Sequence, residues 1–301
     1  MRNATILDFP LEASVHSLLP AVDELVVNVG VSEDDTLERV HAIADPKLRV
    51  IESEWDRSRG TSMLADETQR SMAACRYGWG IYIQADEVLE TGGADRLRAV
   101  IERSDADPGI EGVIVNYAHF YGGFDVVARN RKWYRREVRA VRLDPGHAVR
   151  SYRDAQGFRV GPAHRRIRAV QSEVVMFHYG WARPTWALAA KRVADGELTP
   201  ALLKDVERPL LPWIPGMRTF RGRHPAVAHD WIAARRTTQR LIAPFAPRVH
   251  HLRFMASAWF ERLTGWRAFE YRNYTLIRPR QAAPGHVGER ATAGRGTHQT
   301  S

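Results

Sequence analysis

Short apolar runs alternate with segments of helical periodicity over the first two thirds of the chain. The apolar runs that indicate buried strands cover residues 25–29, 48–51, 81–83, 112–116 and 174–180. Helical spacing of apolar residues predicts helices over 11–19, 32–43 (with Ser32 as the N-cap), 61–77 and around 97–101. Strands that alternate with helices favour an α/β domain, a mostly parallel mixed sheet flanked by helices. We expect this domain to occupy residues 1–205.

Two stretches interrupt this alternation. Residues 117–136 are rich in aromatic side chains, glycine and arginine and predict a long ordered loop, which in a compact domain is usually functional. Residues 137–143 alternate charged and apolar positions, which predicts a half-exposed strand.

The pattern changes again after about residue 205. Prolines at 209, 212 and 215 indicate a connector, and Arg- and Trp-rich helical segments follow, including 249–263. We therefore expect a helical C-terminal extension over 206–277. The polar, aperiodic residues 278–301 predict a disordered tail.

The net charge of the chain indicates which classes of partner it could bind. The formal net charge is +9, and most of the excess comes from arginine. Such a surface suits nucleic acid, anionic lipid or a phosphate-bearing ligand, although a background preference for arginine explains the same excess. The basic C-terminal segment therefore predicts either contact with an anionic membrane or a packed helix with solvated arginines.

Other composition features limit the class of protein. Cys75 is the sole cysteine, so an intramolecular disulfide is excluded. The sequence shows neither a secretory signal peptide nor an apolar run long enough to cross a bilayer. We expect a cytoplasmic protein that is at most peripheral to the membrane.

Polar side chains follow several of the predicted strands. They are Asn28, Asp86 with Glu87, Asn116 with His119, and His178. In open α/β sheets, ligands bind beyond the carboxyl ends of the strands, so these groups form the candidate site. Adjacent carboxylates at a strand end can bind a hard divalent cation, and the cation can hold a diphosphate.

Several segments in chain order carry a family resemblance. They are residues 26–36, 84–87, 119–122, 133–139, 151–159 and 178–181. Over about residues 1–200 the sequence resembles bacterial family 2-like glycosyltransferases of the GT-A fold. The resemblance implies transfer of a sugar from a nucleotide-sugar donor to a hydroxyl of a carbohydrate or lipid-linked acceptor, with inversion. It also implies a role in building a surface polysaccharide or glycoconjugate. We therefore expect no specific binding to nucleic acid.

The resemblance implies a divalent cation, Mg²⁺ or Mn²⁺. The family's acidic motif maps onto Gln84-Ala85-Asp86, in which Gln84 replaces the first acid. Asp86, helped by Glu87, and His178 at the end of a late strand would then bind the metal. The substitution at Gln84 weakens the match at this motif.

The resemblance also assigns substrate contacts. The residues implied for the nucleotide-sugar are Asn28, Ser32, Asp34, Asp35, Gln84 and Asp86. Those implied for the acceptor or diphosphate are His119, Tyr121, Arg135 and Arg136. Inversion needs a general base for the acceptor hydroxyl, and Glu137 is our first candidate, followed by Asp154.

Simpler interpretations stand beside these. Asp86 and Glu87 could be a capping pair, Asp34 and Asp35 first-turn helix acids, and His178 a core histidine. Glu137 could pair with Arg135 and Arg139 on a solvated strand, Asp154 could be a turn residue, and 119–123 a packed aromatic loop. The family normally opens with a strand whose polar end resembles Arg2-Asn3-Ala4, so we expect that strand to be missing, by a downstream start or a truncation.

Three rival functions remain. A nucleotidyltransferase also uses an α/β sheet and a metal, although no glycine-rich phosphate loop is visible. A non-enzymatic, basic nucleic-acid-binding protein would explain the charge. A catalytically inactive relative would explain Gln84 and the short N-terminus.

Overall fold

The fold is that of a computed structural model, which describes residues 1–198, 210–235, 241–246, 248–267 and 270–278. The described strands are β1 Leu25–Gly30, β2 Leu48–Ser53, β3 Trp79–Ile81, β4 Glu87–Leu89, β5 Gly112–Tyr121, β6 Val126–Ala128, β7 Arg136–Arg142, β8 Val149–Tyr152, β9 Gly157–Val160, β10 Arg165–Trp181, β11 Met217–Thr219 and β12 Tyr274–Leu276. The α-helices are α1 Leu11–Leu18, α2 Thr36–Ala42, α3 Met63–Ala74, α4 Gly93–Asp105, α5 Thr185–Leu198, α6 His229–Ala233 and α7 Leu252–Thr264. Short 3-10 helices are η1 Leu19–Ala21, η2 Arg57–Ser62, η4 Ala226–Ala228 and η5 Val249–His251.

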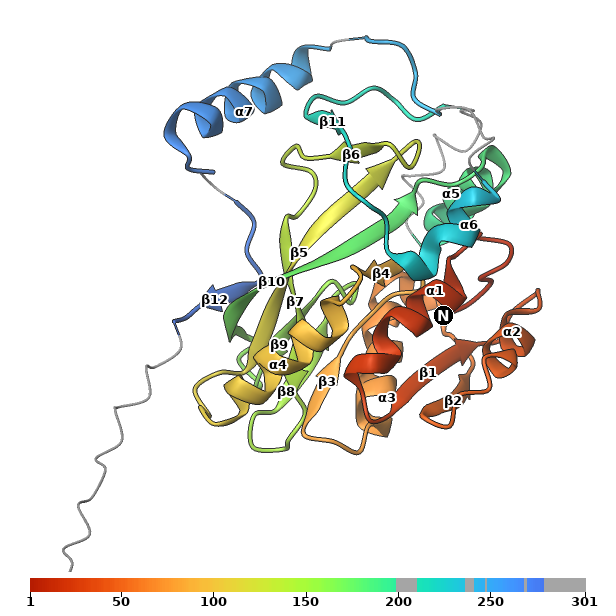
Figure 1. Cartoon of the computed structure of the whole chain (residues 1–301), viewed down its shortest axis with the longest axis vertical. Coiled ribbons are helices and arrows are strands. Elements are labelled where there is room, and N and C mark those ends of the chain that lie inside the picture. The colour runs from red at the N-terminus through yellow and green to blue at the C-terminus, as the bar shows by residue number, and fades with distance from the viewer. Residues whose placement is uncertain (199–209, 236–240, 247, 268–269, 279–301) are drawn as a thin grey trace, which may run out of the picture.

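The strands described form two sheets (Figure 1). β1 and β2 pair in parallel as a two-stranded sheet, and the other ten strands form the main sheet. The long strands β5 and β10 lie side by side in parallel at its centre. β7 and β6 pair antiparallel with β5, and β4 pairs antiparallel with β10.

The expected α/β fold, a mixed sheet flanked by helices, is confirmed, but the expected balance of strand directions is not. Parallel pairs are β1–β2, β5–β10 and β10–β12, whereas the other described pairs are antiparallel. The difference arises because β6 and β7 follow β5, and β4 follows β3, without an intervening helix, so each reverses direction instead of crossing over to a parallel position.

The main core joins the helices to both sheets. Leu11, Leu18 and Leu97 pack with Val27 of β1 and Val113 of β5. Each apolar side chain that is buried in this way stabilises the folded state by roughly 1.5–3 kcal/mol. The core therefore fixes α1 and α4 against the sheets and holds the two sheets together.

The segment 117–136 is not the long loop that its composition predicted. β5 continues through His119 to Tyr121, and β6 returns beside it after the tight connection at Gly122. Gly122 has φ +66°, a left-handed conformation that glycine tolerates best. The aromatic residues that suggested a loop are themselves good strand formers.

Two other local expectations are wrong. β7 was expected to be half exposed, yet its side chains from Glu137 to Arg142 are all buried. Ser32 was expected to cap the next helix, but Asp35 occupies the N-cap of α2, and the Ser32 hydroxyl donates to the carbonyl of Gly30 instead, at 2.8 Å.

The C-terminal part contributes strands as well as helices. β11 pairs with β6 and β12 pairs with β10, so the segment expected as a helical extension also widens the main sheet. Figure 1 shows α7 at the edge of the molecule, beyond the end of β6. The predicted disordered tail, apart from Arg278, lies outside the described residues.

Over the described ranges, no helix is both long enough and apolar enough to pass through a bilayer.

Candidate functional site

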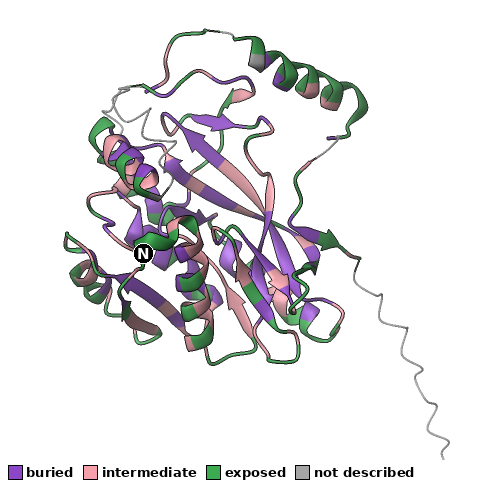
Figure 2. Cartoon of the chain, turned by 180° about the vertical axis from the view of Figure 1, so that it is seen from behind, coloured by how far each residue is buried: buried purple, intermediate pink, exposed green. Residues whose placement is uncertain are grey.

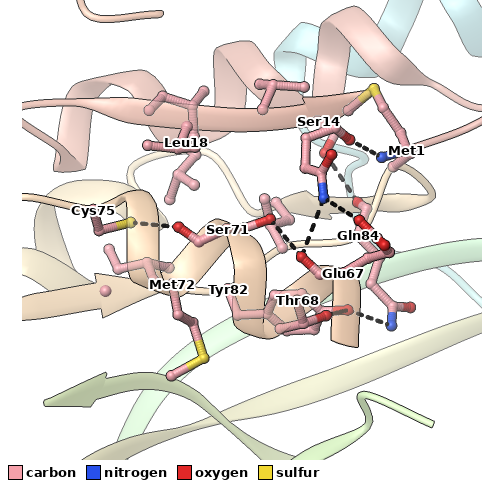
Figure 3. A pocket seen from close by; sticks show the side chains of 18 of the residues that line it. Met1, Ser14, Leu18, Glu67, Thr68, Ser71, Met72, Cys75, Tyr82 and Gln84 are labelled. Carbon is pink, nitrogen blue, oxygen red and sulfur yellow. Dashed lines mark hydrogen bonds between the residues drawn. The ribbon is translucent and has the colours of Figure 1, made fainter. Parts of the chain in front are cut away.

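A cavity of about 710 Å³ lies between β1, α1, α3 and the chain from β3 to Asp86 (Figure 3). Its walls are largely apolar, with Leu18, Met72 and Tyr82 among the lining side chains. Glu67, Gln84 and Asp86 add polar groups. Protein interiors are otherwise close-packed, and ligand pockets measure about 300–1,000 Å³. The cavity therefore has the size and lining of a small-molecule site.

Asn28, in the second half of β1, belongs to a buried polar network on the wall of this cavity. Its amide nitrogen donates to Oε2 of Glu67 at 2.8 Å, and its amide oxygen accepts from the Ser53 hydroxyl at 2.7 Å. Glu67 comes from α3 and is itself buried. This network holds Asn28 in one orientation and places a carboxylate beside it.

The turn from Gln84 to Glu87 links β3 to β4. The backbone N–H of Gln84 donates to Oε2 of Glu87 at 3.0 Å, and the Ser14 hydroxyl of α1 donates to the Gln84 carbonyl at 3.0 Å. The amide side chain of Gln84 donates to the Tyr82 hydroxyl at 3.1 Å. The Glu87 carboxylate thus stabilises the turn. Glu87 and Asp86 have different partners.

Glu87 forms a buried ion pair with Arg139 of β7. The two side chains are fully buried, with Nη2 of Arg139 at 2.9 Å from Oε1 of Glu87. Tyr117 also donates to Oε1 of Glu87, at 2.7 Å. Burial alone would lower the pKa of Arg139, but Glu87 raises it, so the guanidinium stays charged. Glu87 is therefore bound within the core and is not brought together with the other predicted metal ligands.

Asp86 does meet His178, as the sequence predicted. Oδ2 of Asp86 lies 3.6 Å from Nε2 of His178 and 2.9 Å from Nη2 of Arg183. Burial alone would raise the pKa of Asp86, but His178, whenever its ring is protonated, and the permanent charges of Arg183 and Lys191 hold it below its ordinary value. Asp86 is therefore an ionised carboxylate with a cationic surrounding.

His119 fixes the protonation of His178. Nε2 of His119 lies 2.7 Å from the carbonyl of Tyr134, which can only accept, so Nε2 carries the proton. Nδ1 of neutral His119 is then an acceptor, and Nδ1 of His178, 3.0 Å away, must donate to it. Burial lowers the pKa of both histidines, which favours the neutral forms. Nε2 of His178 is then an unprotonated lone pair beside the Asp86 carboxylate.

Gly180 leaves room for this pair. A Cβ atom at Gly180 would lie 2.6 Å from Nε2 of His178 and 2.8 Å from Oδ2 of Asp86. Any larger residue at this position would have to displace one of the two groups.

The 3.6 Å between Oδ2 of Asp86 and Nε2 of His178 is within the span that one divalent cation can bridge, although Arg183 already binds the same carboxylate oxygen. Two donors that each bind a metal at roughly 2.1 Å can share it when they lie within about 4.2 Å of each other. Within the described residues, no set of three or more His, Cys, Asp or Glu side chains could hold a metal. Mg²⁺ commonly takes only one or two protein ligands and completes its shell with phosphate and water.

The predicted nucleotide contacts at Ser32, Asp34 and Asp35 lie outside the lining of the cavity. Asp34 accepts from the backbone N–H groups of Thr5 and Ile6, at 2.9 and 2.8 Å. Asp35 accepts from the Thr5 hydroxyl. These acids tie the first residues of the chain to the segment after β1.

The predicted acceptor residues occupy different environments. The Tyr121 hydroxyl donates to the carbonyl of Pro212 at 2.9 Å. Arg135 forms ion pairs with Glu261 and Glu270, at 2.9 and 2.7 Å, and so binds the C-terminal part. Arg136 begins β7 and is half-buried. Of the four acceptor or diphosphate candidates, His119 contacts His178 directly, with the two Nδ1 atoms 3.0 Å apart.

The two predicted bases lie apart from that pair. Glu137 is fully buried, and neither carboxylate oxygen has a hydrogen-bond partner among the described residues. Burial raises the pKa of Glu137 to about 8, so at neutral pH it is largely protonated. Asp154 lies in the turn between β8 and β9, where it accepts from the Gln156 N–H at 3.4 Å.

Three residues that shape the site were not assigned to it from the sequence. Glu67 is an acid on the buried side of a predicted helix, and Arg139 is a charge between apolar residues of a predicted strand. Both patterns signal a buried polar group that needs a partner. Arg183 follows β10 by two residues and carried no signal in the sequence.

Comparisons with known proteins do not place the chain in a family. No protein-family model matches it, and no curated protein does. Among solved structures it is similar to residues 1–349 of TarS from S. aureus, with a TM-score of 0.35 and 10% identity over 68% of each chain.

Proposed function

We propose that this protein is a glycosyltransferase that moves a sugar from a nucleotide-sugar donor to an acceptor hydroxyl. The reaction would proceed with inversion and with help from Mg²⁺ or Mn²⁺. Its product would belong to a surface polysaccharide or glycoconjugate. The single observation that carries the proposal is the Asp86–His178 pair, which adjoins a cavity of small-molecule size.

The donor is proposed to enter the cavity at the carboxyl end of β1. Gln84 lines this part of the cavity with an amide oxygen that suits a donor group on the edge of a nucleoside, whereas the Asn28 amide is already bonded to Glu67 and Ser53 and would help only by shaping the wall. The diphosphate would lie toward Asp86, where Lys191 also lines the cavity. A cationic surrounding at this end supports the placement, because a diphosphate needs positive charge to leave water.

A divalent cation bound by Asp86 and His178 would screen the diphosphate and stabilise it as a leaving group. His119 holds the His178 imidazole in the tautomer that presents Nε2 toward Asp86. Arg183 binds the same carboxylate and keeps it ionised. His119 and Arg183 therefore orient His178 and keep Asp86 ionised before any ligand binds.

The general base remains a prediction. Glu137, the first candidate, needs to lose its proton before it can accept one. Because its pKa is about 8, a rate that depends on the Glu137 carboxylate should rise with pH through that value. A Glu137→Gln variant would abolish that rise, whereas Asp154→Asn would not.

Product analysis tests the proposal and separates it from its rivals. The protein is incubated with a panel of nucleotide-sugars, simple sugar acceptors and Mn²⁺ or Mg²⁺. Release of nucleoside diphosphate that is lost in Asp86→Asn supports glycosyl transfer. Pyrophosphate released from a nucleoside triphosphate and a sugar phosphate indicates a nucleotidyltransferase instead. Nucleotide binding without either product indicates an inactive relative.

A further inference from the structure

Helix α7 exposes its apolar side chains. Leu252, Trp259 and Leu263 are 62%, 66% and 63% exposed, and Met255, Phe260 and Ala256 are exposed beside them. At 100° per residue these six positions fall on one continuous arc of the helix. A soluble protein normally turns such an arc toward its core.

The opposite arc of α7 faces the rest of the protein. Phe254 is buried, Glu261 binds Arg135 of the segment before β7, and Ser257 accepts from Arg131. Figure 2 shows α7 as a largely exposed helix at the edge of the molecule. The helix is therefore anchored by its polar side and presents its apolar side outward.

Arginines border the apolar arc on both sides. Arg253 lies about 100° from Leu252 in one direction and Arg262 about 80° in the other, and both are exposed. Val249 before the helix and Trp266 after it extend the apolar surface, at 85% and 59% exposed. A contiguous exposed apolar patch of this kind marks an interaction site.

We propose that α7 lies flat in the surface of an anionic lipid bilayer, with its apolar arc among the acyl chains. Leu, Met, Trp and Phe supply the buried area, and Arg253 and Arg262 reach the headgroup phosphates from the edges. The net charge of +9 draws the protein toward an anionic surface. With 13 residues, α7 is short enough to lie on the bilayer rather than span it.

Charge favours a bilayer over a second copy of the chain. Two α7 helices in contact through their apolar arcs would bring Arg253 and Arg262 of both copies around one apolar interface. Like charges at such a border repel, whereas lipid phosphates would pair with them. The docking requires no catalytic activity, so its test is independent of the proposed glycosyl transfer.

The test is co-sedimentation of the full chain with two kinds of vesicle. One is pure phosphatidylcholine and the other contains phosphatidylglycerol in addition. We expect binding to the anionic vesicles that weakens with added salt. Trp259→Ser with Leu263→Ser should reduce that binding by about tenfold or more. Arg253→Gln with Arg262→Gln should reduce it by on the order of tenfold and weaken the preference for anionic lipid.

Trp186→Ser is the matched control, because Trp186 is an exposed tryptophan outside α7. It should bind vesicles as the unchanged protein does, and circular dichroism should show that every variant is folded. Equal vesicle binding by the α7 variants and the control would overturn the proposal. So would the absence of vesicle binding together with a dimer, seen by analytical ultracentrifugation, that the α7 substitutions dissociate.

Discussion

Nδ1 of His119 lies 3.0 Å from Nδ1 of His178, and the carbonyl of Tyr134 determines which of the two donates. Because the Nε2–H of His119 donates a hydrogen bond to that carbonyl, Nδ1 of His119 must accept, and His178 must carry its proton on Nδ1. The lone pair of His178 is thereby presented to Asp86. A backbone carbonyl in the core thus sets the state of a side chain at the cavity.

This relationship predicts the tautomer of His178. Nitrogen-15 NMR at neutral pH should show a protonated Nδ1 and an unprotonated Nε2 on His178. His119→Phe should remove the preference, because the acceptor of the Nδ1 proton is lost. An Nε2-protonated His178 in the unchanged protein would contradict the assignment.

Gly180→Ala should separate His178 from Asp86. The added methyl group would lie under 3 Å from both side chains, so one of them must move. We expect the variant to lose about 1–3 kcal/mol of folding free energy and to weaken metal-dependent nucleotide binding by about tenfold or more. Chemical denaturation and isothermal titration calorimetry measure these two effects.

Gly146→Ala provides the comparison, since Gly146 is exposed, lies outside the cavity lining, and its added Cβ atom would come no closer than 3.3 Å to the Asp144 carboxylate. It should retain nucleotide binding. If Gly180→Ala also binds nucleotide and metal like the unchanged protein, Asp86 and His178 have no part in ligand binding.

The Glu87–Arg139 pair should show strong coupling in a double-mutant cycle. Glu87→Gln or Arg139→Met alone leaves a buried group without its partner and should cost about 3–5 kcal/mol of stability. The double variant should cost much less than the two single losses together. Arg59→Met, at the exposed pair with Asp66, should cost little. Additive losses at Glu87 and Arg139 would mean that the two charges do not stabilise each other.

Glu137 should make the stability of the protein depend on pH. Its pKa is raised from 4.5 to about 8, so between these values the folded state holds a proton that the unfolded state has lost. Stability should therefore fall as pH rises from about 4.5 to 8, by on the order of a few kcal/mol in total.

Glu137→Gln removes this titration. Relative to the unchanged protein, its melting temperature should be similar near pH 5 and higher near pH 8. Glu173→Gln, at an exposed carboxylate of β10, should leave the pH profile as it was. A Glu137→Gln profile parallel to that of the unchanged protein would show that the carboxyl ionises normally in the fold.

The sequence located Asp86 and His178 for a physical reason. Both follow apolar runs, and β4 pairs with the end of β10 in a register that places His178 opposite Glu87, next to Asp86. Polar groups at neighbouring strand ends are thus brought to one place, although the strands proved antiparallel. Hydrophobic patterning located the helices and strands on the same basis.

Other features depend on contacts that pattern alone does not encode. Arg139 and Glu137 looked like the solvated side of a strand, yet both are buried, because Glu87 compensates the Arg139 charge and Glu137 is protonated. Ser32 and Asp34 looked like ligand contacts but bind the N-terminal residues. Arg183 reaches Asp86 across 97 positions of sequence, a pairing that follows only from the fold.

The most direct test of the central claim is a thermal-shift titration with nucleoside diphosphates, with and without Mn²⁺ or Mg²⁺. One nucleotide should raise the melting temperature in the presence of metal, by an amount that corresponds to about 2.7 kcal/mol at a hundredfold excess over its Kd. Asp86→Ala should lose most of this gain, and Glu173→Gln should keep it. The account is contradicted if no nucleotide stabilises the protein with either metal, or if Asp86→Ala is stabilised as much as the unchanged chain.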